Sequence, residues 1–96
     1  MREIKFRAWH IPTKKMFDVF SWCKDYVLMQ FTGLKDKNGV DIYEGDVLQN
    51  NENKKGVVEF FDGSFCLKSN GFYVLNNGYL KNKKVIGNIY ENPELL

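Results

Sequence analysis

The spacing of hydrophobic and polar residues in this 96-residue chain predicts short β-strands rather than helices. From residue 2 to residue 9 the two kinds alternate, which is the period of a half-buried strand. The apolar positions there are Ile4, Phe6 and Ala8, and the charged positions between them are Lys5 and Arg7. Pro12 interrupts the ladder and segment 16–22 resumes it, so an N-terminal hairpin is the simplest structure. Segment 24–31 fits either a third strand or an irregular link.

The clearest hairpin is predicted between residues 57 and 68, around the turn signal Asp62-Gly63. A two-residue turn there places four apolar residues on one face: Val58, Phe60, Phe65 and Leu67. The other face is mixed and is expected to be wetter: Val57, Glu59, Phe61, Ser64, Cys66 and Lys68. A shift by one residue would expose the apolar set to water, so turn and pattern agree on one register.

A further turn is predicted at Asp36-Lys37-Asn38-Gly39, which fits a type I turn followed by a left-handed glycine. A tighter turn formed by Asn38-Gly39 alone would place Asp36 opposite Asp41. Like charges that face each other across strands are destabilising, so the longer turn is preferred.

Two more turn signals, Asn70-Gly71 and Asn77-Gly78, bound a predicted strand at 72–75, and a closing strand is expected at 85–90. Short strands at this spacing predict an all-β meander that closes into a small barrel. No segment carries a sustained helical stripe. Asn92-Pro93-Glu94 resembles a helix start, which allows a short C-terminal turn.

Composition limits the remaining choices. The length indicates one domain, and 44% hydrophobic with 16% aromatic residues can form a core without a metal or a disulfide. Cys23 and Cys66 form no Cys-x-x-Cys pair, and a single histidine cannot complete a zinc site with them. No apolar run approaches the roughly 20 residues of a membrane span, and residues 1–15 contain no apolar run long enough for a signal peptide. We therefore expect a cytoplasmic protein with free thiols.

Candidate catalytic chemistry is sparse. Asp41, Glu44 and Asp46 are close enough in sequence to suggest an oxygen-ligand metal site, but no second cluster completes it. The preferred interpretation is that Gly45 permits a tight bend which Glu44 and Asp46 solvate. His10, the only histidine, has no Ser, Cys or carboxylate partner placed by local spacing. We therefore predict no catalytic residue, no metal ligand and no cofactor.

The strongest binding signal is a group of lysines interleaved with aromatic residues. The candidate nucleic-acid-binding residues are Lys54, Lys55, Lys81, Lys83, Lys84, Tyr73 and Tyr79, with Phe72 nearby. Lysines can neutralise phosphates while exposed aromatic rings stack on bases, as small barrels do with single strands. Lysine also solvates ordinary strand edges and aromatic residues are often core, and a net charge of +2 alone does not indicate nucleic acid.

Four segments resemble the signature blocks of the YopX family, small proteins encoded by phages and prophages. They are Arg2-Glu-Ile-Lys-Phe-Arg-Ala-Trp9, Thr32-Gly-Leu-Lys-Asp-Lys-Asn-Gly39, Ile42-Tyr-Glu-Gly-Asp-Val47 and Ile86-Gly-Asn-Ile-Tyr-Glu-Asn-Pro-Glu-Leu95. The resemblance implies a phage or prophage origin and a single YopX-like domain over 1–96. Within it, an N-terminal β region (1–31) would precede an SH3-like barrel (32–96). It also implies that self-association is an option, and it offers no catalytic residue to carry over.

Three classes of function follow. The preferred one is a non-enzymatic accessory protein that binds an unidentified host or phage protein through sheet edges or an exposed face. The second is a small nucleic-acid-binding barrel, and the third is a metal-dependent enzyme. The apolar pair Leu95-Leu96 either packs on the chain's own barrel or docks on a neighbour, and oligomerisation would cover leftover apolar surface.

Overall fold

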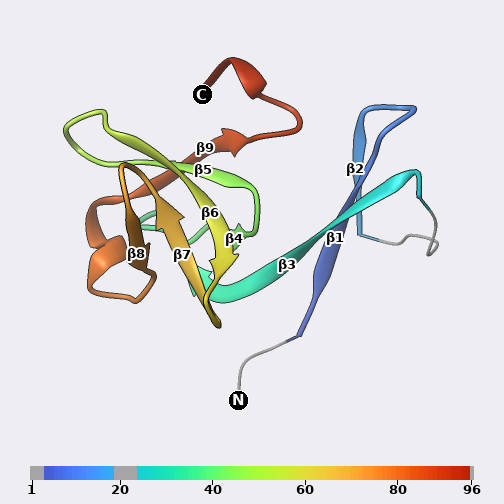
Figure 1. The fold of residues 1–96 in the computed structure, drawn as a ribbon. Helices are drawn as coiled ribbons and strands as arrows, with labels where there is room; N and C mark the ends of the chain where they lie inside the picture. Colours follow the sequence, from blue (N-terminus) through green and yellow to red (C-terminus); the bar gives the residue numbers. More distant parts are fainter. Residues whose placement is uncertain (1–3, 19–23, 96) are drawn as a thin grey trace.

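The computed structural model describes residues 4–18 and 24–95, which form antiparallel strands joined by tight turns (Figure 1). The strands are β1 (Phe6–His10), β2 (Lys15–Phe17), β3 (Tyr26–Lys35), β4 (Asp41–Tyr43), β5 (Asp46–Gln49), β6 (Lys55–Phe61), β7 (Ser64–Lys68), β8 (Phe72–Val74) and β9 (Lys84–Asn88). Two 3-10 helices, η1 (Tyr79–Asn82) and η2 (Pro93–Leu95), complete the described elements. Within these residues, no helix has the length and apolar character needed to cross a membrane.

The first sheet has the order β2-β1-β3-β4 and contains the predicted N-terminal hairpin. In it Ala8 of β1 lies opposite Phe17 of β2 and opposite Leu28 of β3. Segment 24–31 is therefore largely strand, and the part of segment 16–22 beyond residue 18 lies outside the described residues. β3 continues through residues 31 and 32, so one strand joins the N-terminal β region to the barrel (Figure 1).

The second sheet has the order β8-β7-β6-β5-β9 and curls into the SH3-like barrel (Figure 1). The predicted register of the β6–β7 hairpin is confirmed, since Phe60 faces Phe65 and Val58 faces Leu67. Asp62 and Gly63 both adopt positive φ, at 52° and 82°, as a two-residue primed turn requires. The last strand, β9, returns to pair with β5 on the side opposite β6.

The longer turn between β3 and β4 is also confirmed. The Gly39 N–H donates to the Asp36 carbonyl at 3.0 Å, and Gly39 has φ of +81°. The buried Asp36 carboxylate accepts backbone N–H groups from Asn38, Val40 and, across the barrel, Val85. Asp36 therefore holds the turn and also ties it to β9.

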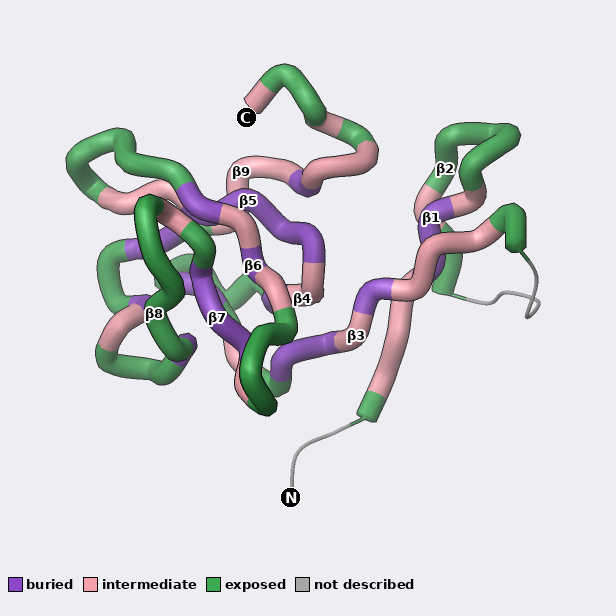
Figure 2. The backbone as a smooth tube through the Cα atoms, viewed as in Figure 1, coloured by how far each residue is buried: buried purple, intermediate pink, exposed green. Residues whose placement is uncertain are grey.

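The barrel core is filled from both sheets (Figure 2). Its buried residues are Ile42, Leu48, Val58, Phe65, Leu67, Leu75 and Leu80. Ile42 comes from β4 of the first sheet, and Leu48 comes from β5 of the second, between β6 and β9. Both have no exposed surface. The end of the first sheet thus acts as a wall of the barrel.

A buried ion pair joins the N-terminal region to this barrel. The Arg7 guanidinium of β1 donates to the Asp46 carboxylate of β5, and the side chains are 16% and 1% exposed. The Tyr43 N–H donates to the second Asp46 oxygen at 2.8 Å. Burial raises the pKa of Asp46 above its usual value of 3.8, although the Arg7 charge acts in the opposite direction. Trp9, also from β1, stacks on Tyr90 beyond β9.

Two sequence predictions of burial are wrong in this region. Asp46 does not solvate the bend at Gly45, because it is buried against Arg7. The apolar Ile4, predicted on the buried face of the first strand, is 74% exposed. The physical reason is that β1 begins only at Phe6, so Ile4 precedes the strand, whereas Ala8 of the same alternation is fully buried. Lys5 and Arg7 meanwhile find ion-pair and aromatic partners.

The segment after β8 turns at Asn77-Gly78, as the turn signal predicts, but the turn leads into η1, a helix that the sequence pattern did not predict. Gly78 itself has helical angles (φ −66°, ψ −44°) and precedes η1. The Asn76 side chain accepts the Tyr79 N–H at 2.9 Å, and buried Leu80 anchors the helix in the core. The short C-terminal turn at residues 93–95 is confirmed as η2.

Candidate functional site

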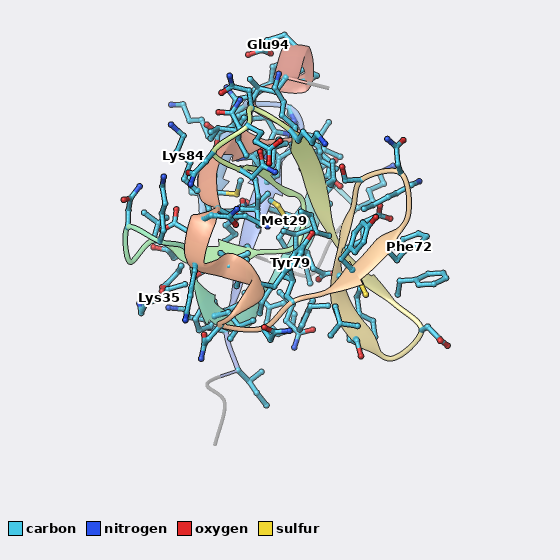
Figure 3. The ribbon with its side chains drawn as sticks, turned by 90° about the vertical axis from the view of Figure 1, so that its left-hand side faces the viewer. Met29, Lys35, Phe72, Tyr79, Lys84 and Glu94 are labelled. Carbon is cyan, nitrogen blue, oxygen red and sulfur yellow. The ribbon has the colours of Figure 1, made fainter. Side chains whose placement is uncertain are left out.

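An exposed apolar patch covers the outer face of the barrel where β6, β7 and β8 meet. We define this outer patch as Phe61, Phe72 and Val74, which are 49%, 42% and 58% exposed. The Phe61 and Phe72 rings stack with centroids 4.0 Å apart, and Figure 3 shows Phe72 pointing away from the sheet. Cys66, which pairs with Val74, is a buried free thiol on the same face. The face predicted to be wetter is therefore the face that exposes aromatic rings.

The outer patch borders the edge of β8, where backbone N–H and C=O groups point away from the sheet. The Leu75 N–H donates to Phe65 O and the Ser69 N–H donates to Gly71 O, at 3.0 and 2.9 Å. The backbone groups that form hydrogen bonds with β7 therefore belong to residues 71, 73 and 75. Because bonding direction alternates along an antiparallel strand, the N–H and C=O groups of Phe72 and Val74 point away from β7. We call this side the free edge of β8.

Charge distinguishes this edge from the others. Of the four edge strands in the described part of the chain, β2 contains Lys15, β4 contains Asp41 and β9 contains Lys84. Charged side chains on an edge discourage pairing with other chains. β8, with the sequence Phe72-Tyr73-Val74, contains no charge and no proline. The edge of β8 is short, and no charge or proline protects it from pairing with another strand. The uncharged run Phe72-Tyr73-Val74 is visible in the sequence, but it was not used to predict which edge is open.

A second surface feature, the basic groove, collects five of the seven predicted nucleic-acid-binding residues. The groove has a volume of about 530 Å³ and is lined by Leu48, Asn50, Lys54, Lys55, Leu67, Ser69, Asn70, Tyr73, Tyr79 and Lys83. The Tyr73 and Tyr79 rings stack at 6.0 Å with 17° between their planes. Sequence reasoning missed the groove's polar amides and hydroxyl, because nothing in a loop asparagine marks it as facing a groove.

Lys83 has an unusual place in this groove. It is only 8% exposed, and its ammonium lies 3.7 Å from the centre of the Tyr79 ring. The ammonium donates to the Tyr79 carbonyl and the Asn82 side chain at 3.1 and 3.0 Å. Burial lowers the pKa of Lys83, because an ammonium loses its hydration there. Burial likewise raises the pKa of the Tyr79 hydroxyl.

The two remaining predicted lysines lie outside the groove. Lys84 is exposed on β9, opposite Gln49 of β5, and Figure 3 shows it and Tyr79 at separate positions. Lys81 is exposed on η1 and lines a different, shallower depression with Lys35 and Lys37. The structure therefore brings together Lys54, Lys55, Lys83, Tyr73 and Tyr79 but not Lys81 and Lys84.

The three candidate metal-binding carboxylates, Asp41, Glu44 and Asp46, each bind a different partner. Asp41 binds Lys5 and Lys35, at 2.8 and 2.5 Å, and hydrogen bonds from both lysines lower its pKa. Glu44 accepts the Gln30 N–H at 2.9 Å. Asp46 binds Arg7. Across residues 4–18 and 24–95, no group of three His, Cys, Asp or Glu side chains could hold a metal ion.

His10 lies at the end of β1, where its Nδ1 is 2.6 Å from the Thr13 hydroxyl. Its ring packs beside Tyr26, with the centroids 4.6 Å apart. Cys66, the free thiol among the described residues, is buried on β7 of the second sheet, whereas His10 is on β1 of the first.

Comparison with known proteins identifies a family and a similar solved structure. A family model described as "YopX protein" matches residues 18–96. The crystal structure of protein EF1440 from Enterococcus faecalis is similar over 100% of this chain and 99% of that chain, with a TM-score of 0.84 and 29% identity. No curated protein matches the chain.

Proposed function

The chain belongs to the YopX protein family, and from this premise we propose that it is a phage or prophage accessory protein that binds another protein. The binding mode is strand addition, in which an extended segment of the partner pairs with the free edge of β8. The observation that supports this proposal is that one strand, β8, has both an uncharged edge and two residues of the outer patch. Main-chain bonds provide affinity in this mode, and pockets for alternate side chains provide specificity.

The surroundings define the chemistry of the partner segment. The outward-facing groups of Phe72 and Val74 allow a short antiparallel or parallel pairing, and the side chains of both residues lie on the outer face with Phe61. A partner strand would therefore place apolar side chains against these rings. Lys68, whose ammonium is 5.9 Å from the centre of the Phe72 ring, favours an acidic residue beside them. The expected ligand is an apolar strand from a second protein with an acidic flank.

Replacing Val74 with lysine should weaken this binding, because the substitution adds a charge to the edge and to the patch at once. Full-length wild-type protein, Val74→Lys and a control, Val40→Lys, are immobilised and exposed to bacterial host lysate, and captured proteins are quantified by mass spectrometry. Val40 is a matched control, since it is a 47% exposed valine in the β3–β4 turn region. We expect one partner to be retained by Val40→Lys and reduced about tenfold by Val74→Lys, which corresponds to about 1.4 kcal/mol.

A photo-crosslinking amino acid in place of Phe72 then identifies the segment that pairs with β8. Cross-links concentrated in one apolar segment of the captured protein support strand addition. Equal capture by all three proteins contradicts the proposal. A third result would also overturn the proposal: cross-links only between copies of this chain, together with a changed sedimentation coefficient for Val74→Lys. In that case β8 would be a self-association surface.

A further inference from the structure

We propose that the basic groove binds single-stranded nucleic acid, with Lys54, Lys55 and Lys83 facing phosphate and the Tyr73–Tyr79 pair stacking on a base. This second activity does not depend on the protein-binding function at β8. The groove and the outer patch share no residue, and Tyr73 points to the other face of the sheet from Phe72 and Val74, because it alternates with them along β8. Each surface can therefore be altered while the other is kept.

The positive charge of the groove favours binding of an anion. Its lining contains three lysines and no Asp or Glu. Lys83 is the decisive member: its buried ammonium has neutral partners in Tyr79 and Asn82, but no carboxylate lies within salt-bridge distance of it among the described residues, so its charge is not neutralised. A bound phosphate would supply that missing countercharge. Lys54 and Lys55 are both exposed and line the same groove, and the Lys55 ammonium also donates to the Leu95 carbonyl at 3.2 Å.

The aromatic pair indicates that the anion carries a base. The Tyr73 ring lies nearly parallel to Tyr79, and Tyr73 is 47% exposed, so one face of the stack is open to solvent. Bases stack on such rings with little regard to sequence, because every base has a π-face. A simple phosphate or sulfate would use the lysines and leave this stack unused.

The position of Lys84 favours a polymer over a mononucleotide. Gln49 of β5 lies opposite Lys55 on one side and opposite Lys84 on the other. Residues paired in this way share one face of a sheet, and adjacent strands are about 4.8 Å apart, so the two lysines form a row across three strands. Lys84 lies beyond the groove and would contact the backbone of a strand that continues out of it.

The test is fluorescence anisotropy of labelled oligothymidine and oligouridine, each about 12 nucleotides long, because small barrels cover about 4–16 nucleotides. We expect saturable binding that weakens steeply between about 50 and 200 mM salt. Lys54→Gln/Lys55→Gln should bind about tenfold more weakly and lose about two from the slope of log affinity against log salt. Lys14→Gln/Lys15→Gln is the matched control, since it removes two exposed adjacent lysines in the β1–β2 hairpin.

Tyr79 separates stacking from general attraction to polyanions. Tyr79→Leu should weaken binding by about fivefold or more, whereas Tyr79→Phe, which keeps the ring, should bind like the wild type. Thermal unfolding of each variant confirms that it is folded. Three outcomes overturn the proposal: no saturable binding at low salt, equal losses in both lysine pairs, or unchanged affinity in folded Tyr79→Leu. None of these outcomes bears on Val74 and the partner at β8.

Discussion

Replacing Arg7 with methionine is expected to lower the free energy of unfolding at neutral pH by about 3–5 kcal/mol, because removing one partner leaves a buried charge uncompensated. Asp46 is 1% exposed, so water cannot replace the guanidinium. Urea unfolding measures the loss. Lys35→Met is the control, since Lys35 pairs with Asp41 but is 61% exposed, and such surface pairs contribute about 0–1 kcal/mol. Equal losses in the two variants would contradict a special role for the buried pair.

The same variant should depend on pH in a defined direction. Burial raises the pKa of Asp46 in the folded wild-type protein, and removing Arg7 takes away the main opposing charge and raises this pKa further. The folded variant then binds a proton more readily than the unfolded chain does. Its deficit relative to wild type should shrink as pH falls through the raised pKa toward 3.8, and grow again as pH rises. A deficit independent of pH between 4 and 7 would indicate lost packing instead.

Replacing Leu48 with alanine is expected to cost about 2–5 kcal/mol, the usual range for a buried leucine that leaves a cavity. Leu48 has no exposed surface and lies on β5, the strand that β6 and β9 both pair with. The urea midpoint should fall with little change in slope, which indicates lost stability without a change in compactness. Val40→Ala, at a 47% exposed position, should change the free energy of unfolding by less than about 0.5 kcal/mol.

The sequence was most informative where turn chemistry and side-chain alternation agree. Asp62-Gly63 set the register of β6 and β7, because a one-residue shift would have turned Val58 and Leu67 to water. Asp36 and Gly39 likewise specified the longer turn before β4. These are local constraints, and each involves residues that lie close together along the chain.

Predictions failed where long-range pairing decides burial. Arg7 and Asp46 look like surface residues in their own segments, and only the approach of β1 to β5 makes them a buried pair. Lys83 is a local exception, because its ammonium contacts Tyr79 and Asn82 across the end of η1, a helix that the sequence pattern did not predict. Phe60, predicted on the inner face, is 54% exposed, although Phe65, which lies opposite it, is buried in the core.

The return of β9 to β5 has a consequence for synthesis on the ribosome. The order β8-β7-β6-β5 follows the chain, so those strands can pair one after another as they emerge, but the far side of β5 must wait for Lys84–Asn88. Until then Leu48 and the Asp36 carboxylate lack their β9 contacts at Val85. The nascent barrel is therefore open along β5 during most of its translation. That edge, rather than β8, is the one that chaperones would have to shield at this stage.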